Sequence, residues 1–164
     1  MLNIDKKAHY IAVTGILIKN GKYLIAKRAS FEKAFPSRWT VPGGKLEVED
    51  YLAREKDTNI HWYNVLESVL RREVKEEVGL DIKNIGYVTS MVYIRDDEIP
   101  CLIVSLYAEP TTDEIKLCDA LTEYAWVDLE EAKNYDLIEG IYHELFILDS
   151  FLNSGKNMEW KKTV

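Results

Sequence analysis

The stretch Arg72-Glu73-Val74-Lys75-Glu76-Glu77-Val78-Gly79-Leu80 predicts the last turns of a helix that holds three carboxylates on one side. At roughly 100° per residue, Glu73, Glu76 and Glu77 fall within one arc of the helix. The same arc continues an apolar, core-facing stripe one turn earlier, formed by Leu66, Val69 and Leu70. Glu73 and Glu77 are also like charges at i,i+4, which destabilises an isolated helix by about 0.2–0.5 kcal/mol. An arrangement this unfavourable for folding indicates a bound cation.

Both ends of this helix carry sequence signals. Asn64-Val65-Leu66-Glu67 matches a capping box, with the Asn side chain at the N-cap, so we expect the helix at about 65–78. Gly79 is the expected stop. The preceding segment, about 47–63, is polar and aperiodic. It predicts an ordered insertion with a turn of helix near 50–54.

Upstream of the insertion, residues 10–28 predict a β-hairpin whose Asn20-Gly21 dipeptide suits a type I′ turn. Residues 39–41 predict a short strand that ends in Pro42-Gly43-Gly44. Two glycines allow the backbone to approach a ligand or a helix closely. The hairpin ends with two cations, Lys27 and Arg28. They are either ordinary charged residues at the edge of a sheet or residues that contact a phosphate. We expect Arg28 to lie in the substrate site.

Downstream, strands are expected at 85–94, 101–108 and 123–127, all rich in β-branched and aromatic residues. Asp128 can cap a short helix that runs through Ala132. A last helix is expected at about 137–152, with a short frayed tail from about 153. Strands on both sides of an embedded helix predict one α/β domain over 1–164, an α/β/α sandwich around a mixed sheet.

The composition and net charge of the chain narrow the classes of molecule that we expect it to bind. The chain has 164 residues, is 47% hydrophobic and carries a net charge of −7, which argues against a nucleic-acid polymer or an anionic membrane as the main partner. Two cysteines are too few for a disulfide framework and fit a reducing compartment. No apolar run is long enough to span a bilayer and the first residues lack a signal-peptide core. We expect a cytoplasmic protein.

Three glutamates at i, i+3 and i+4 offer hard oxygen ligands, which suit Mg²⁺ or Mn²⁺ rather than zinc. The three histidines lie in separate segments without ligand spacing, at His9, His61 and His143. Arg72 is an i,i+4 neighbour of Glu76 and can orient its carboxylate. The alternative to a metal site is that the glutamates form a solvated, acidic C-terminal end of the helix, although the helix macrodipole disfavours acids at that end.

These residues resemble the Nudix box, G-x5-E-x7-R-E-U-x-E-E-x-G-U, in which U is aliphatic. REVKEEVGL at 72–80 matches every fixed position of its second half, and Trp39-x-x-Pro42-Gly43-Gly44 matches the usual approach to it. The resemblance implies a hydrolase of nucleoside diphosphates linked to another moiety, through water attack on phosphorus. It implies catalytic roles for Arg72 and the three glutamates, a metal on those glutamates and on the Gly44 carbonyl, substrate contact at Gly43 and Gly44, and a homodimer.

One departure from the pattern is clear. Arg72 follows Gly44 by 28 positions where the pattern has 14, so 14 extra residues lie inside the box. Counting forward from Gly44 places Asp50 at the first glutamate position, and counting back from Arg72 places Asn64 there. Candidates for that role are Glu47, Glu49 and Asp50, of which we prefer Asp50. We hypothesise that the insertion forms part of the substrate pocket wall, where Tyr51 or Trp62 packs a base or sugar; structural packing is the alternative.

The general base and the substrate stay open at this level. An acid before the tryptophan strand is one family solution and offers Glu114, Asp119 and Glu123, each of which is by default an exposed loop acid. Substrates of the nucleoside triphosphate or nucleotide-sugar type fit the resemblance. Rival functions are a non-catalytic nucleotide-binding sensor and an isoprenoid-diphosphate isomerase, which requires a cysteine–glutamate pair that Cys101 and Cys118 do not evidently supply.

Overall fold

A mixed seven-stranded sheet organises the computed structural model, which describes residues 6–162. Its strands are β1 (Tyr10–Lys19), β2 (Lys22–Arg28), β3 (Trp39–Thr40), β4 (Gly43–Lys45), β5 (Ile82–Ile94), β6 (Pro100–Pro110) and β7 (Leu121–Val127). The helices are α1 (Glu49–Leu52), α2 (Val65–Val78), α3 (Leu129–Ala132) and α4 (Ile141–Ser154).

The main path of the sheet runs β3-β2-β1-β6-β5, with β4 paired to β1 and β7 paired to β2. Strand β1 pairs in parallel with β6, and its other pairings are antiparallel. The predicted hairpin at 10–28 is confirmed. Asn20 and Gly21 both have positive φ, 52° and 73°, as a type I′ turn requires. The apolar β1 is central, and Val13, Ile16 and Leu17 are fully buried.

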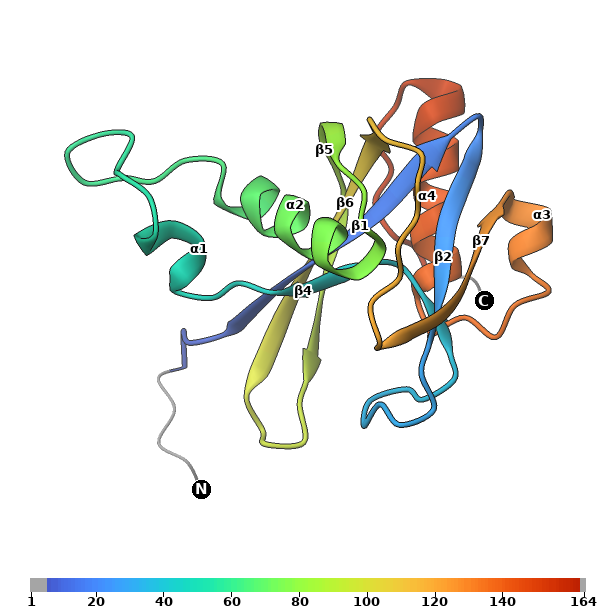
Figure 1. Cartoon of the computed structure of the whole chain (residues 1–164), viewed down its shortest axis with the longest axis horizontal. Coiled ribbons are helices and arrows are strands. Elements are labelled where there is room, and N and C mark those ends of the chain that lie inside the picture. Colours follow the sequence, from blue (N-terminus) through green and yellow to red (C-terminus); the bar gives the residue numbers. More distant parts are fainter. Residues whose placement is uncertain (1–5, 163–164) are drawn as a thin grey trace.

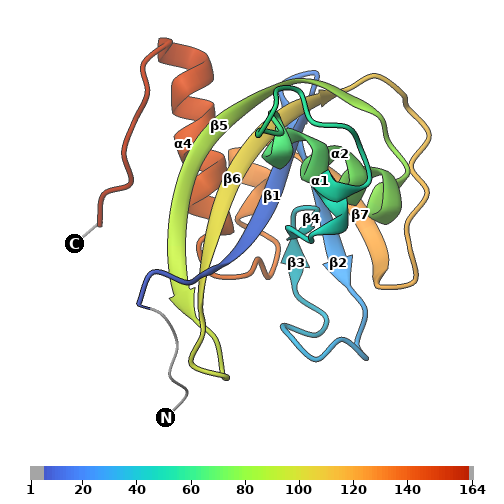
Figure 2. The ribbon, with the colours of Figure 1, turned by 90° about the vertical axis from the view of Figure 1, so that its left-hand side faces the viewer.

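Helices α2 and α4 cover opposite faces of the sheet (Figures 1 and 2). One core cluster joins α2 to the sheet through buried residues that include Val69, Leu70 and Val74. The second cluster joins α4 to the other face through residues that include Leu145 and Leu148. The predicted α/β/α sandwich around a mixed sheet is therefore confirmed. Helix α2 covers 65–78 as predicted. It ends at Gly79, which has φ 76° and whose N–H donates a hydrogen bond to the Lys75 carbonyl.

The start of α2 corrects one prediction. Asn64 has left-handed backbone angles, φ 53° and ψ 37°, and its side chain makes no capping hydrogen bond. A side-chain cap needs extended backbone at this position, so the predicted capping box is wrong although the helix start is right. The Asn64 carbonyl instead accepts a hydrogen bond from the Ser68 hydroxyl. The expected cap at Asp128 does form, as a capping box with Glu131.

The last helix was predicted about four residues too early. Leu137 forms a bridge to Trp39 and the Ile138 N–H donates to the Trp39 carbonyl, so these residues extend the sheet edge rather than a helix. Gly140, at φ 96°, then turns the chain into α4. The helix continues to Ser154, beyond the expected start of a frayed tail, and Trp160 of that tail contacts His143 with ring centroids 6.3 Å apart. The final two predicted tail residues lie outside the described range.

The segment at 47–63 is ordered by its own contacts. Tyr51 and Trp62 lie with ring centroids 5.4 Å apart, and the Trp62 indole N–H donates to the Arg54 carbonyl. The Lys56 ammonium lies 5.0 Å from the centre of the Trp62 ring. These contacts favour the structural-packing alternative for both aromatics. Among residues 6–162, no helix has the length and apolar character needed to cross a bilayer.

Candidate active site

Glu77 is the most enclosed acid of the α2 cluster. Its Oε2 accepts a hydrogen bond of 2.9 Å from the Gly43 N–H, which ties the helix to β4. Burial raises the pKa of Glu77 to about 7, and the Gly43 N–H and the Arg28 charge act in the opposite direction. Glu73 adds repulsion that also raises this pKa. The ionised form of Glu77 is therefore unfavourable in this enclosed position. A bound cation would stabilise it, so the position is typical of a cation site.

Glu73 lies against the second glycine of the pair. A Cβ at position 44 would stand 2.0 Å from Glu73 Oε1, so only glycine leaves room for this carboxylate. Burial raises the pKa of Glu73, while the adjacent Arg72 guanidinium lowers it. The two glycines expected to permit a close approach thus do so, and each faces one glutamate of the cluster.

Gly44→Ala tests this close approach. The added methyl group displaces the Glu73 carboxylate, whose flexible end can move, so we expect Tm to change little. We expect catalytic activity to fall at least about tenfold, the size of effect that follows when a residue supporting a metal ligand is changed. A loss of both stability and activity would instead indicate a backbone role.

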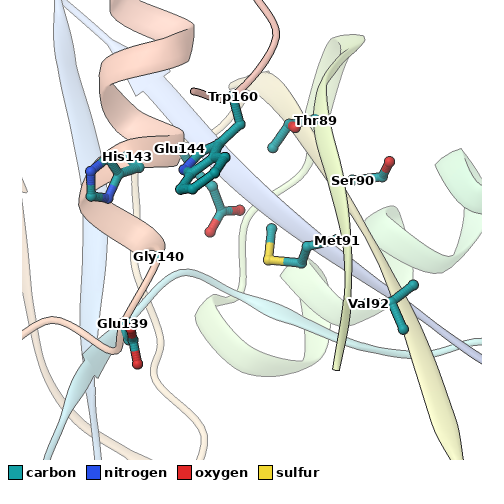
Figure 3. A pocket seen from close by; sticks show the side chains of 9 residues that line it. All are labelled: Thr89, Ser90, Met91, Val92, Glu139, Gly140, His143, Glu144 and Trp160. Atoms are coloured by element: carbon teal, nitrogen blue, oxygen red, sulfur yellow. The ribbon is translucent and has the colours of Figure 1, made fainter. Parts of the chain in front are cut away.

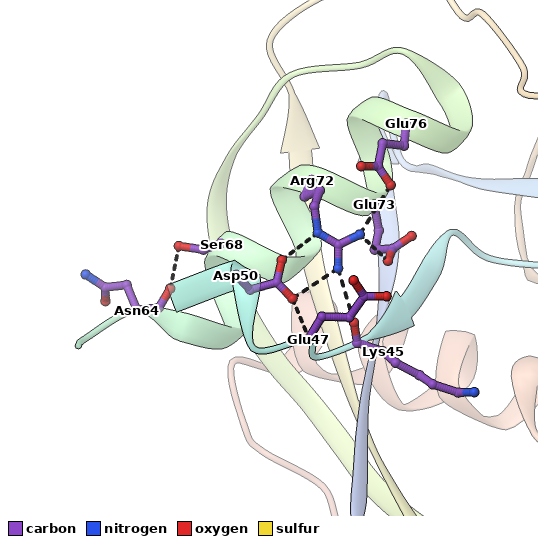
Figure 4. Close-up of polar contacts among 8 residues, drawn as sticks. All are labelled: Lys45, Glu47, Asp50, Asn64, Ser68, Arg72, Glu73 and Glu76. Carbon is purple, nitrogen blue, oxygen red and sulfur yellow. Dashed lines mark hydrogen bonds and ion pairs between the residues drawn. The ribbon is translucent and has the colours of Figure 1, made fainter. Parts of the chain in front are cut away.

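Arg72 connects the insertion to the acidic helix (Figure 4). Its guanidinium donates to Asp50 at 2.6 and 3.1 Å, to Glu73 at 2.7 Å, to Glu76 at 3.2 Å and to the Lys45 carbonyl at 3.1 Å. The Asp50 side chain is only 6% exposed, and Arg72 is the main cause of its lowered pKa. Of the three candidates for the missing first glutamate, Asp50 is the one that braces the loop to the helix.

Asp50→Ala removes the largest set of contacts that Arg72 makes. We expect the free energy of unfolding to fall by about 1–2 kcal/mol, less than for a fully buried pair, because Arg72 is 30% exposed and keeps Glu73 and Glu76 as partners. Urea titration measures this loss. Glu49→Ala, an exposed acid on the same helix, is the matched control. Equal losses in the two variants would show that Asp50 has no special bracing role.

Glu76 departs from the arrangement of its neighbours. Its side chain is 59% exposed and turned toward Arg72, so the three glutamates do not converge as the helical arc alone implied. Within residues 6–162, no group of three or more Asp, Glu, His or Cys side chains is arranged so that it could hold a metal ion. The donor chemistry nevertheless fits Mg²⁺ or Mn²⁺. Glu73 and Glu77 each use one oxygen on a protein donor, and within the described chain their other oxygens accept no hydrogen bond.

The three acids considered as general base lie in different settings. Glu114 is 79% exposed and pairs with Lys116, and Glu123 is 56% exposed and pairs with Lys27 at 2.9 Å. Asp119 is exposed but follows Cys118, whose N–H donates to the Glu77 carbonyl. Backbone bonds therefore place the Asp119 turn beside the end of α2. No described contact assigns the base, which stays a prediction.

Two predicted substrate contacts have protein partners in the structure. Arg28 donates to Glu32 at 2.9 Å and to the Ala34 carbonyl at 2.8 Å, yet it is near enough to Glu77 to lower that pKa. Trp62 packs within the insertion. The predicted substrate roles of Arg28 and Trp62 stay predictions. The hypothesis that the insertion forms part of the substrate pocket wall stays a prediction.

Sequence reasoning missed the chemistry of α4. Glu144 is 5% exposed, and burial raises its pKa to about 7. A signal was available: Glu144 lies three residues after Ile141 and four before Leu148, both buried, so it interrupts an apolar stripe as Glu77 does on α2.

Thr14, opposite Gly43 in the β1–β4 register, was also missed; its buried hydroxyl has no hydrogen-bond partner within the described chain.

Glu144→Gln should change how stability depends on pH. The pKa of Glu144 is about 7 in the folded protein and about 4.5 when unfolded. The folded state therefore binds more protons between these values, and wild-type stability falls as pH rises from 4.5 to 7, by up to about 3 kcal/mol. Gln cannot titrate, so we expect the variant to be more stable than wild type at pH 8 and to lose that advantage at pH 4.5.

Urea unfolding at both pH values measures the difference. Glu139→Gln, an exposed acid two residues before the same helix, is the control and should give the same small difference at both pH values. A Glu144→Gln difference that is independent of pH would contradict the buried neutral carboxyl.

Comparison with known proteins gives this arrangement a family. A family model described as NUDIX domain matches residues 9–145. Nucleoside triphosphatase NudI of Escherichia coli O17:K52:H18 is 28% identical over 136 residues, covering 74% of this chain and 84% of the relative. The MutT NUDIX hydrolase from Burkholderia pseudomallei aligns with TM-score 0.66 and 17% identity, over 85% of this chain and 98% of that one.

A further solved structure is the NUDIX domain of Shewanella oneidensis NrtR complexed with ADP ribose, with TM-score 0.62 and 18% identity over 92% of this chain and 94% of that one. These structures share the α/β/α sandwich fold of this chain. Since the family model spans most of the chain, the protein belongs to the Nudix family, and it is a Nudix pyrophosphohydrolase. The resemblance seen in residues 39–80 is confirmed.

Proposed function

We propose that this protein is a Mg²⁺- or Mn²⁺-dependent hydrolase that cleaves the pyrophosphate linkage of a nucleotide, with nucleoside triphosphates as the first candidates and nucleotide sugars as the second. The observation that carries the proposal is the position of Glu73 and Glu77 against Gly44 and Gly43. Two partly buried acids beside a glycine backbone suit a cation and a phosphate chain together. The name of the NudI relative favours triphosphates.

The proposed metal ligands are Glu73, Glu76 and Glu77, with the Gly44 carbonyl as a fourth donor. A divalent cation bound there would neutralise phosphate charge and lower the pKa of a bound water. Glu77 is positioned by the Gly43 N–H, and Arg72 holds the carboxylates of Glu73 and Glu76 in place.

Proton transfer requires a separate group. A base within hydrogen-bond reach must accept the proton of the attacking water. Asp119 is our first candidate, because Cys118 bonds to the end of α2, and Glu123 and Glu114 follow. Arg28 is proposed to contact a phosphate. Its charge already acts on Glu77, and exchange of Glu32 for an anionic substrate would keep it paired.

We further propose a single domain over 1–164 with an insertion at about 47–63, a cytoplasmic location and a homodimer. The net charge of −7 supports a small-molecule substrate over a nucleic-acid polymer.

A substrate panel tests the proposed function. Nucleoside and deoxynucleoside triphosphates, nucleotide sugars and ADP-ribose are incubated with excess Mg²⁺, and released phosphate and pyrophosphate are measured. We expect turnover of at least one triphosphate that stops when a chelator removes the metal. A nucleotide that raises Tm without turnover would support the binding-sensor alternative and contradict the enzymatic proposal.

A further inference from the structure

The loop between β2 and β3 places an acid of its own on the arginine that ends β2. Nη2 of Arg28 donates to Oε2 of Glu32 at 2.9 Å. Only 23% of the Arg28 side chain and 27% of the Glu32 side chain are exposed. The Lys133–Glu130 pair, at 51% and 82%, is much more open to water. The Arg28–Glu32 pair is therefore less screened by solvent than such surface pairs.

Two other hydrogen bonds hold Arg28 without the help of Glu32. Its Nε donates to the Ala34 carbonyl at 2.8 Å, and its backbone N–H donates to the Arg38 carbonyl at 2.9 Å. These bonds fix the strand end and the near side of the guanidinium. We therefore expect Arg28 to keep its place when the Glu32 carboxylate leaves it.

Arg28 also acts on the acidic cluster of α2. Its charge lowers the pKa of Glu77, against the larger effect of burial, which raises that pKa. An arginine beside a proposed metal ligand repels a metal ion. The same charge becomes favourable when phosphate oxygens lie between the metal ion and the guanidinium. The position of Arg28 therefore suits a phosphate better than a metal ion alone.

Glu32 and a phosphate would compete for the same donors. A guanidinium presents one planar set of N–H groups that matches carboxylate and phosphate oxygens alike. A phosphate that approached Arg28 while Glu32 stayed in place would meet a like charge, which is unfavourable. The chain attaches Glu32 to this region by a bond of 3.2 Å from its N–H to the Ala29 carbonyl, which leaves its side chain free to rotate away.

We propose that Glu32 is an internal competitor of the substrate. Its carboxylate binds Arg28 in the free protein, and a phosphate group of the nucleotide displaces it. This inference rests on the proposed function, because it requires a substrate phosphate at Arg28. Glu32 is a positioning residue that acts through Arg28. It lowers the affinity for phosphate and so restricts binding to ligands whose phosphate chain can replace it.

The competition should not depend on the nucleobase. Figure 3 shows a cavity of about 550 Å³ between α4 and β5, whose lining includes Met91, His143 and Glu144. Among the described residues that line it, neither Arg28 nor Glu32 is present. Changes at Glu32 should therefore affect nucleotides with different bases equally, and inorganic pyrophosphate, which has no base, should reveal the effect.

Calorimetry of pyrophosphate binding in excess Mg²⁺ tests the proposal with wild type, Glu32→Gln, Arg28→Gln and the double variant. Gln keeps the size of the Glu32 side chain and removes its charge. We expect pyrophosphate to bind about three- to tenfold more tightly to Glu32→Gln, because Arg28 is no longer held by an anion. In the Arg28→Gln background the same change should have no effect. Glu130→Gln, which frees Lys133 on α3, controls for the loss of one negative charge and should bind as wild type does.

Kinetics supply the second measurement. In Glu32→Gln, KM should fall by a similar factor for two triphosphates with different bases, without a rise in kcat, because binding that is equal in the ground and transition states lowers KM only. Equal pyrophosphate affinity in wild type and Glu32→Gln would overturn the proposal, and weaker binding in the variant would show that Glu32 orients Arg28 instead. If Glu32→Gln binds pyrophosphate more tightly but no nucleotide is hydrolysed, the proposed function fails and the competition stands. If hydrolysis occurs with unchanged pyrophosphate affinity, only this inference fails.

Discussion

Replacing Glu77 with Gln is expected to reduce metal-dependent hydrolysis of the substrate more than about 100-fold. This loss exceeds the usual effect of changing a residue that only supports a metal ligand. The substitution removes the charge but keeps the size of the side chain. A Gln oxygen can still accept the 2.9 Å hydrogen bond from Gly43, so the contact between α2 and β4 is preserved. The loss should therefore appear in kcat at saturating Mg²⁺ and not in Tm.

Glu67→Gln is the matched control, because Glu67 lies on the same helix but in its first turn, away from the cluster. Initial rates across a Mg²⁺ titration should be unchanged in this variant. Wild-type kcat in Glu77→Gln would contradict the proposed role of the α2 carboxylates.

Leu70→Ala is expected to cause the largest loss of stability among the substitutions considered. Leu70 is fully buried in the cluster that docks α2, and its Cδ1 would lie only 2.4 Å from a Cβ built on Gly15 of β1. Removing a buried leucine side chain costs about 2–5 kcal/mol, because the lining collapses only partly into the cavity. We expect Tm to fall by about 4–20 °C, at about 2–4 °C per kcal/mol for a chain of this size.

Leu152→Ala provides the comparison for Leu70→Ala. Leu152 lies in the last turn of α4, and its side chain is 47% exposed. Differential scanning calorimetry of both variants should show a change of less than about 0.5 kcal/mol for Leu152→Ala. Similar shifts in the two variants would indicate that α2 is not held by this cluster.

The helix that carries the acids could be predicted because its signals are local. Periodicity, a stop at Gly79 and acids on an apolar stripe are all contained in residues 65–80. The hairpin turn at Asn20-Gly21 and the cap at Asp128 were predicted for the same reason. Each depends on a backbone preference or a hydrogen bond within four residues.

The features that sequence reasoning missed depend on distant partners. β4 contains two glycines with low strand propensity and forms because it pairs with the first half of β1, whereas β2 pairs with the second half. Leu137 continued a helical pattern, but its bridge to Trp39 removed it from α4. The environment of Glu144 is set by β5 and β6, which precede it by about forty to fifty residues, so no local pattern could describe the cavity.

Binding of Mn²⁺ measured by electron paramagnetic resonance, with a non-hydrolysable nucleoside triphosphate present, tests the central claim most directly. The ion is titrated into wild type, Glu77→Gln and Glu67→Gln. The account predicts that Glu77→Gln binds Mn²⁺ at least about tenfold more weakly, while Glu67→Gln matches wild type. The same Mn²⁺ affinity in all three proteins would contradict a metal site on the carboxylates that α2 holds against Gly43 and Gly44.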